Sequence, residues 1–91
     1  MTFEDVVGFM QSLVSSNVEV ETGEDDMIRA VDHTSNAEAF VKYSGGLEFS
    51  LQGIRNGEKD PTKVFSFRNE QEMLCILGPK LLECLDGERR I

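Results

Sequence analysis

Residues 37–52 decide the expected fold, and they read Ala-Glu-Ala-Phe-Val-Lys-Tyr-Ser-Gly-Gly-Leu-Glu-Phe-Ser-Leu-Gln. Apolar and polar side chains alternate on both sides of Gly45-Gly46, and a period of two predicts half-buried strands. Because both glycines tolerate positive φ, the pair predicts a two-residue turn between two antiparallel strands. The face expected to point inward carries Ala39, Val41, Tyr43, Leu47, Phe49 and Leu51.

Three further strands are predicted around this hairpin. Residues 18–22 (Val-Glu-Val-Glu-Thr) alternate apolar and acidic side chains, and residues 27–32 follow them after an acidic turn. Residues 63–67 form a short apolar run after the polar connection 55–61, which is rich in turn-forming residues. Short connections favour antiparallel pairing of neighbours in the chain.

A helix is predicted at each end of the chain. Residues 3–15 place apolar side chains at helical spacing, with Thr2 as N-cap and Asp5 at the third helical position. Asn69 followed by Glu72 indicates the start of a closing helix that ends near residues 86–87. Pro79 interrupts that pattern, so either one helix kinks there or two short helices meet.

These elements predict an α+β fold in the order α-β-β-β-β-β-α. A mainly antiparallel meander sheet of four or five strands would have the N-terminal and C-terminal helices on one face. The length of 91 residues fits a single two-layer domain, 1–91, in which residues 87–91 form a frayed tail.

The charge is strongly acidic and unevenly placed. Seventeen acidic and nine basic residues give a net charge of −8, which argues against direct binding to nucleic acid. Residues 1–38 contain nine acids and one base, whereas residues 39–91 contain eight of each. An acidic beginning, the absence of a long apolar run and only two cysteines indicate a cytoplasmic protein that does not enter a membrane.

Residues with catalytic chemistry are few. His33 is the single histidine, and adjacent strand residues such as Asp32 and His33 point to opposite faces. Cys75 and Cys84 are too far apart along a helix for a disulfide, and both are expected to be buried thiols. Residues 24–26 lack the ligand spacing of an EF-hand. We therefore expect no enzyme, no catalytic residue, no cofactor and no metal.

The acidic region suggests a non-catalytic protein-binding module. Glu19 and Glu21 lie on one face of their strand, and the turn after it extends this acidic row. Such a row can dock on a basic surface that normally holds phosphates, as small phage-type antagonists of host defence enzymes do, and so act as a nucleic-acid mimic and inhibitor. The same acids would also serve to solvate the surface, and charge alone does not separate the two roles. The expected partner-binding residues are Glu19, Glu21, Glu24, Asp25 and Asp26.

The alternative is a chaperone-like or assembly protein that acts as a homodimer through its closing helix. Residues 73–77 (Met-Leu-Cys-Ile-Leu) are apolar on all sides, so they are either buried in a monomer or pair with another subunit. Binding that weakens with salt would favour the acidic row, and salt-insensitive binding would favour the helix. The possible dimer contact consists of Met73, Leu74, Ile76 and Leu77.

Overall fold

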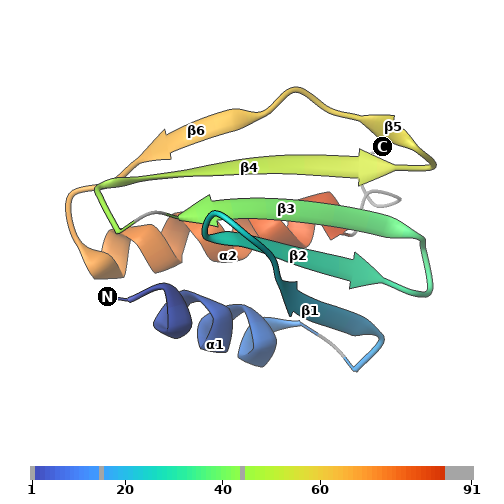
Figure 1. The fold of residues 1–91 in the computed structure, drawn as a ribbon, viewed down its shortest axis with the longest axis horizontal. Helices are drawn as coiled ribbons and strands as arrows, with labels where there is room; N and C mark the ends of the chain where they lie inside the picture. Colours follow the sequence, from blue (N-terminus) through green and yellow to red (C-terminus); the bar gives the residue numbers. More distant parts are fainter. Residues whose placement is uncertain (1, 15, 44, 86–91) are drawn as a thin grey trace.

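The computed structural model describes residues 2–14, 16–43 and 45–85. Their order confirms an α+β chain that begins and ends with a helix (Figure 1). The elements are α1 (Phe3–Leu13), β1 (Val18–Thr22), β2 (Met27–Asp32), β3 (Ala37–Tyr43), β4 (Glu48–Arg55), β5 (Glu58–Lys59), β6 (Lys63–Ser66) and α2 (Glu70–Leu85).

All strand pairs are antiparallel, and they form one sheet in the order β1-β2-β3-β4-β5. β6 also pairs with β4, beyond the end of β5. The sheet therefore has six strands, but β5 and β6 share one side of β4. This is the predicted meander, with its last strand divided in two.

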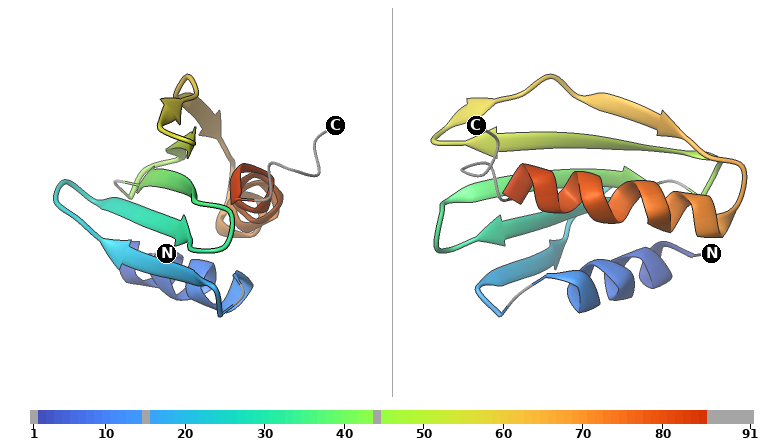
Figure 2. Two further views of the ribbon diagram at one scale, coloured as in Figure 1. Left: turned by 90° about the vertical axis from the view of Figure 1, so that its right-hand side faces the viewer. Right: turned by 180° about the vertical axis from the view of Figure 1, so that it is seen from behind.

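Both helices lie over the same face of the sheet. Figure 1 looks onto the other face, with α2 behind the strands, and the reverse view in Figure 2 has α2 in front of them. α1 contacts β1, whereas α2 contacts β3 and β4, and the two helices also contact each other. The opposite face, which we call the open face, is covered by neither helix.

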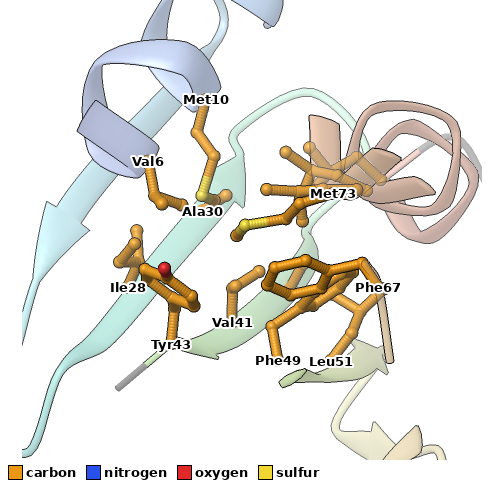
Figure 3. Close-up of a cluster of buried hydrophobic side chains, with 14 residues drawn as sticks. Val6, Met10, Ile28, Ala30, Val41, Tyr43, Phe49, Leu51, Phe67 and Met73 are labelled. Atoms are coloured by element: carbon orange, nitrogen blue, oxygen red, sulfur yellow. The ribbon is translucent and has the colours of Figure 1, made fainter. Parts of the chain in front are cut away.

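The core lies between the sheet and the two helices. Val6 and Met10 of α1, Met73 of α2 and Phe49 of β4 belong to one hydrophobic cluster, and all four side chains are at least 99% buried (Figure 3). Gly53 allows β4 to approach Cys84 of α2 closely, and Gly78 of α2 lies against Phe9 and Leu13 of α1. The remaining buried members are Ile28, Ala30, Ala39, Val41, Tyr43, Leu51, Phe67, Leu77, Leu81 and Leu85.

Polar side chains fix the start of both helices. The hydroxyl of Thr2 accepts the N–H of Asp5 at 3.2 Å, and the carboxylate of Asp5 accepts the N–H of Thr2 at 3.0 Å. The amide oxygen of Asn69 accepts the N–H of Glu72 at 2.9 Å. These contacts confirm the predicted caps, since each satisfies an N–H that the helix leaves unpaired.

The closing helix is a single element. α2 runs through Pro79 without separating into two helices, so of the two predicted possibilities the meeting of two short helices is wrong. α1 ends at Leu13, two residues before the predicted end. The predicted end of α2 near residues 86–87 and the predicted frayed tail 87–91 lie outside the described residues.

The predicted turn at Gly45-Gly46 is wrong. Tyr43 of β3 pairs with Phe49 of β4, so the connection is longer than two residues. Leu47, which was expected to point inward, lies in this connection and is 62% exposed. The alternation continues through Leu47 in the sequence, but β4 begins only at Glu48.

A two-residue turn of the hairpin type occurs instead at Asn56-Gly57. Asn56 (φ 55°) and Gly57 (φ 81°) both have the positive φ that a type I′ turn requires. This turn joins β4 to β5, within the segment that was expected to be an irregular connection. β4 consequently extends to Arg55, three residues beyond the predicted strand.

The segment formed by β5 and β6 contains one residue more than the part of β4 with which it pairs. Ile54 pairs with Lys59 and Leu51 pairs with Lys63, so four steps along β5 and β6 match three steps along β4. Pro61 lies between these two pairs and cannot donate to β4. The insertion has the effect of a β-bulge and divides the outer strand.

Candidate protein-binding surface

The acidic turn, defined as Glu24, Asp25 and Asp26, joins β1 to β2 (Figure 1). All three residues are exposed. The N–H of Met27 donates to the carbonyl of Glu24 at 3.2 Å, and the N–H of Tyr43 donates to the carbonyl of Asp26 at 3.3 Å. Because the second bond reaches β3, the backbone of the turn is tied to the sheet.

Two members of the acidic turn have an unusual backbone conformation. Asp25 (φ 56°) and Asp26 (φ 60°) lie in the left-handed region, which costs side-chain-bearing residues free energy and which glycine and asparagine tolerate best. Aspartate is among the few residues with side chains that are enriched in this region, so the turn carries its carboxylates at positions whose conformation suits them. In the described part of the chain, all other positive φ values belong to Asn36, Asn56, Gly45 and Gly57.

The carboxylates of the acidic turn form no ion pair with another described residue. Their exposed position leaves each of them hydrated and able to meet a cation from outside the chain. Three consecutive unpaired carboxylates on a fixed backbone form a compact negative site, and this is the strongest charge cluster that the structure places on one loop.

Glu19 and Glu21 occupy the open face, as predicted from the alternation in β1. Their side chains are 50% and 49% exposed. Glu19 lies 3.8 Å from the imidazole Nε2 of His33, a surface residue whose side chain is 65% exposed. The two glutamates therefore stand on one face, but they have different neighbours.

Arg29 of β2 changes the charge of the open face. Its guanidinium binds Glu21 at 3.1 Å and Glu38 of β3 at 2.7 Å. The hydrogen bond to Glu38 is the main cause that raises the pKa of Arg29, with burial opposing it and Glu21 adding to it. Because Arg29 is shared with Glu38, it offsets only part of the negative charge of Glu21, and the acidic row is weaker at Glu21 than at the turn.

The contribution of Arg29 depends on strand pairing. Glu21 faces Arg29 directly, and Arg29 faces Phe40 of β3. To predict this register from the sequence, one must know at which residue β1 ends and at which β2 begins. The turn-forming composition of residues 23–26 does not show this. The hydrophobic alternation reveals only that Arg29 and Glu21 lie on the same face of the sheet.

The residues of the alternative dimer contact are mostly inside the molecule. Met73 and Leu77 are completely buried against the core of their own chain. Leu74 and Ile76 are half-buried. Cys75 is exposed, so the expectation of two buried thiols is wrong for this residue, because it lies on the outer side of α2.

A groove of about 250 Å³ lies between β4, β6 and α2. Leu51, Pro61 and Phe65 form apolar parts of its lining. The charged residues of the lining are two lysines and two acids: Lys63, Lys80, Asp60 and Glu83. Cys84 lies inside it, half-buried and not in a disulfide. His33, which directly follows β2, does not line this groove.

Within residues 2–14, 16–43 and 45–85, no three His, Cys, Asp or Glu side chains are grouped in a way that could hold a metal ion. In the same ranges, neither helix has the length and apolar character needed to cross a bilayer.

Comparison with protein-family models, with curated proteins and with solved structures finds no match to this chain.

Proposed function

We propose that this protein is a non-catalytic binding module of the cytoplasm that inhibits or regulates a protein partner. The acidic turn, together with Glu19 near the start of β1 on the open face, would dock on a basic surface of the kind that holds nucleic-acid phosphates. The partner would then be a nuclease or another nucleic-acid-handling protein, as for phage-type antagonists of host defence enzymes. Glu21 would contribute less, because Arg29 already offsets part of its charge.

The observation that carries the proposal is the acidic turn itself. It presents Glu24, Asp25 and Asp26 to solvent, without an ion pair to another described residue, on a backbone that is bonded to the sheet. A fixed group of like charges attracts an oppositely charged surface at long range and accelerates encounter. Since the turn is already ordered, binding would not have to order it.

The experiment compares the protein with the double variant Asp25→Asn/Asp26→Asn. Asparagine keeps the shape and tolerates the left-handed conformation, so the change removes charge and leaves the turn intact. Partners are first captured from host extract, and one purified partner is then titrated against both proteins at low and high salt. We expect the double variant to bind at least about tenfold more weakly at low salt, and the difference to shrink at high salt.

The matched control is Glu58→Gln/Glu83→Gln. It removes the same number of negative charges as the turn variant does, but at two exposed positions outside the turn. It should change the dissociation constant less than about twofold, because screening weakens distant charges. Equal affinity of all three proteins for the partner would refute the proposal. Salt-insensitive binding that is lost in Leu74→Asp would instead support the chaperone-like alternative.

A further inference from the structure

β1 forms one margin of the sheet, and β5 and β6 form the opposite margin (Figure 1). Among the described strands, β1 pairs with β2 alone, in a register that runs through all five of its residues without interruption. The opposite margin is divided, because β5 and β6 have two and four residues and Pro61 lies between them. β1 is therefore the margin that offers an unbroken template to a further strand.

One hydrogen bond at the end of β1 shows which of its backbone groups point outward. Gly23, which directly follows β1, donates its N–H to the carbonyl of Met27 of β2 at 2.8 Å. Because backbone groups alternate in direction along an antiparallel strand, the odd-numbered residues of β1 face β2, whereas Val20 and Thr22 face away from it. The backbone groups of Val20 and Thr22 form no hydrogen bond with another described residue. Both residues can therefore pair with a strand from outside the chain.

The side chains of β1 define which strand would fit. Glu19 and Glu21 stand on the open face with about half of each side chain exposed, whereas Val18 and Val20 are half-buried and pack against the core. Residues directly opposite each other in paired strands have neighbouring side chains on the same face. A strand added to β1 would therefore place alternate side chains against carboxylates and the intervening ones beside apolar residues.

The helix side of this margin is apolar because of α1. Phe9 and Leu13 lie against Gly78 of α2, so Val7 and Val14 occupy the flank of α1 that points away from α2. Since α1 contacts β1 while α2 contacts β3 and β4, this flank lies toward the outer side of β1. Val7 and Val14 are half-buried. Apolar side chains of an added strand would pack beside them.

A second copy of this chain does not fit the margin. A twofold axis that joins two β1 strands in antiparallel order keeps the open faces of both copies on one side. Every register in which three or more residues of β1 overlap then places Glu19 or Glu21 opposite a glutamate of the other copy. Like charges directly opposite each other are destabilising. The margin is thus unfavourable for self-pairing and favourable for a strand of opposite charge.

We propose that the outer side of β1 binds an extended peptide segment of a partner protein as an additional antiparallel strand. Lysine or arginine of the segment would stand opposite Glu19 and Glu21, and apolar residues would stand opposite Val18 and Val20. In strand addition of this kind, backbone hydrogen bonds provide the affinity and alternate side chains provide the specificity.

The backbone pattern brings the opposite charges close together. Val20 and Thr22 would form hydrogen-bonded pairs with the new strand, so Glu19 and Glu21 would stand at the other positions, where opposite Cα atoms are only about 4.5 Å apart. Arg29 lies on the other side of β1 from the added strand, and its guanidinium already binds two carboxylates. This part of the open face therefore stays negative and suits a basic segment.

Strand addition at β1 does not depend on the proposed function, because it uses the backbone of β1 and not the acidic turn. A synthetic peptide tests it without any natural partner. The turn variant Asp25→Asn/Asp26→Asn should bind this peptide within about threefold of the original affinity, because the turn lies outside the paired residues. Loss of the natural partner in the turn variant, with the peptide still bound, would keep the two proposals distinct.

The probe is the acetylated and amidated peptide Thr-Val-Lys-Val-Lys-Val-Thr, which is titrated against the full chain. We expect a dissociation constant below about 1 mM that rises with salt. With saturating peptide, hydrogen exchange followed by NMR should slow at least about fivefold at the amides of Val20 and Thr22. The amides of Glu19 and Glu21 should change much less, because they already face β2.

Two N-methylated peptides separate strand pairing from simple charge attraction. N-methylation of the central valine removes the donor to the carbonyl of Val20 and should weaken binding at least about tenfold. N-methylation of the lysine opposite Glu19 should weaken it at most about threefold, because the N–H of that lysine points away from β1. Equal affinity of the two methylated peptides would overturn the proposal.

Charge reversal tests the specificity. Glu19→Lys/Glu21→Lys should bind the lysine peptide at least about tenfold more weakly and should instead prefer the peptide in which both lysines are replaced by glutamate. Glu58→Lys/Glu83→Lys reverses the same number of charges at exposed positions outside β1 and should change the affinity less than about threefold. Circular dichroism verifies that each variant is folded. No binding of the lysine peptide, no slower exchange at Val20 and Thr22, or an unchanged peptide preference after charge reversal would each overturn the proposal.

Discussion

Asp26 combines a negatively charged side chain with a left-handed backbone conformation. Its φ of 60° lies where a side chain costs about 1–2 kcal/mol relative to the right-handed region. Asn36 and Asn56 occupy the same conformation in two other turns of the chain. Asparagine and aspartate both adopt this conformation more readily than other residues with side chains, so Asp26→Asn changes the charge while the backbone preference stays similar.

Replacing Asp26 separates these two contributions. Asp26→Gly should raise the free energy of unfolding by about 0.5 kcal/mol, because the relief of left-handed strain exceeds the extra chain entropy of glycine. Asp26→Asn should stay within about 0.5 kcal/mol of the original protein. Urea denaturation measures both. A clear loss of stability in Asp26→Gly would show that the carboxylate stabilises the turn.

At the scale of the elements, the free space around a glycine shows how closely a neighbouring element approaches it. Gly53 of β4 leaves space for α2, since an added Cβ would lie 3.1 Å from the carboxylate Oδ2 of Asp60 and 3.3 Å from Sγ of Cys84. Gly8 of α1 is exposed, and an added Cβ there would meet nothing within 4 Å. The same residue type thus has a packing role in one element and none in the other.

This contrast predicts opposite effects on stability. Gly53→Val should lower the free energy of unfolding by about 1–3 kcal/mol, because its side chain must displace α2 from β4. Gly8→Ala should raise it by about 1 kcal/mol, because alanine is the better helix former and the site is open. Chemical denaturation of both variants tests this. Stabilisation by Gly53→Val would mean that α2 does not contact β4 at Cys84.

The elements also show which parts of the structure the sequence predicts. Alternation identifies β1, β2 and β3, and capping residues identify both helices, because these patterns are local. Leu47 follows the alternation but lies outside the sheet, since alternation does not reveal where pairing stops. β5 has two residues, too few for any periodic pattern. The ion pair of Glu21 with Arg29 depends on cross-strand register, which needs the turn conformation as well.

At the scale of the whole molecule, acid should destabilise the fold through two helix starts. The N–H of Thr2 is the main cause that lowers the pKa of Asp5, and the side chain of Arg68 is the main cause that lowers that of Glu72. A carboxyl with a lower pKa in the folded state binds fewer protons there than in the unfolded state. Its stabilising contribution is present above its ordinary pKa of about 4 and is lost as the pH falls through the lowered value.

The prediction is a fall in the free energy of unfolding between about pH 6 and about pH 3. The double variant Asp5→Asn/Glu72→Gln should be less stable at the higher pH and should show a smaller fall over the same range, because its side chains no longer titrate. Denaturation at both pH values provides the measurement. An equal fall in the two proteins would assign acid sensitivity to other carboxyl groups.

The divided outer strand has a consequence for behaviour at high concentration. β5 and β6 have two and four residues, and Pro61 and the extra residue between them interrupt the backbone groups that face outward. A neighbouring chain that tried to add a strand here would find a template too short and too bent to follow. On this side, the break protects the protein from lateral growth into fibres.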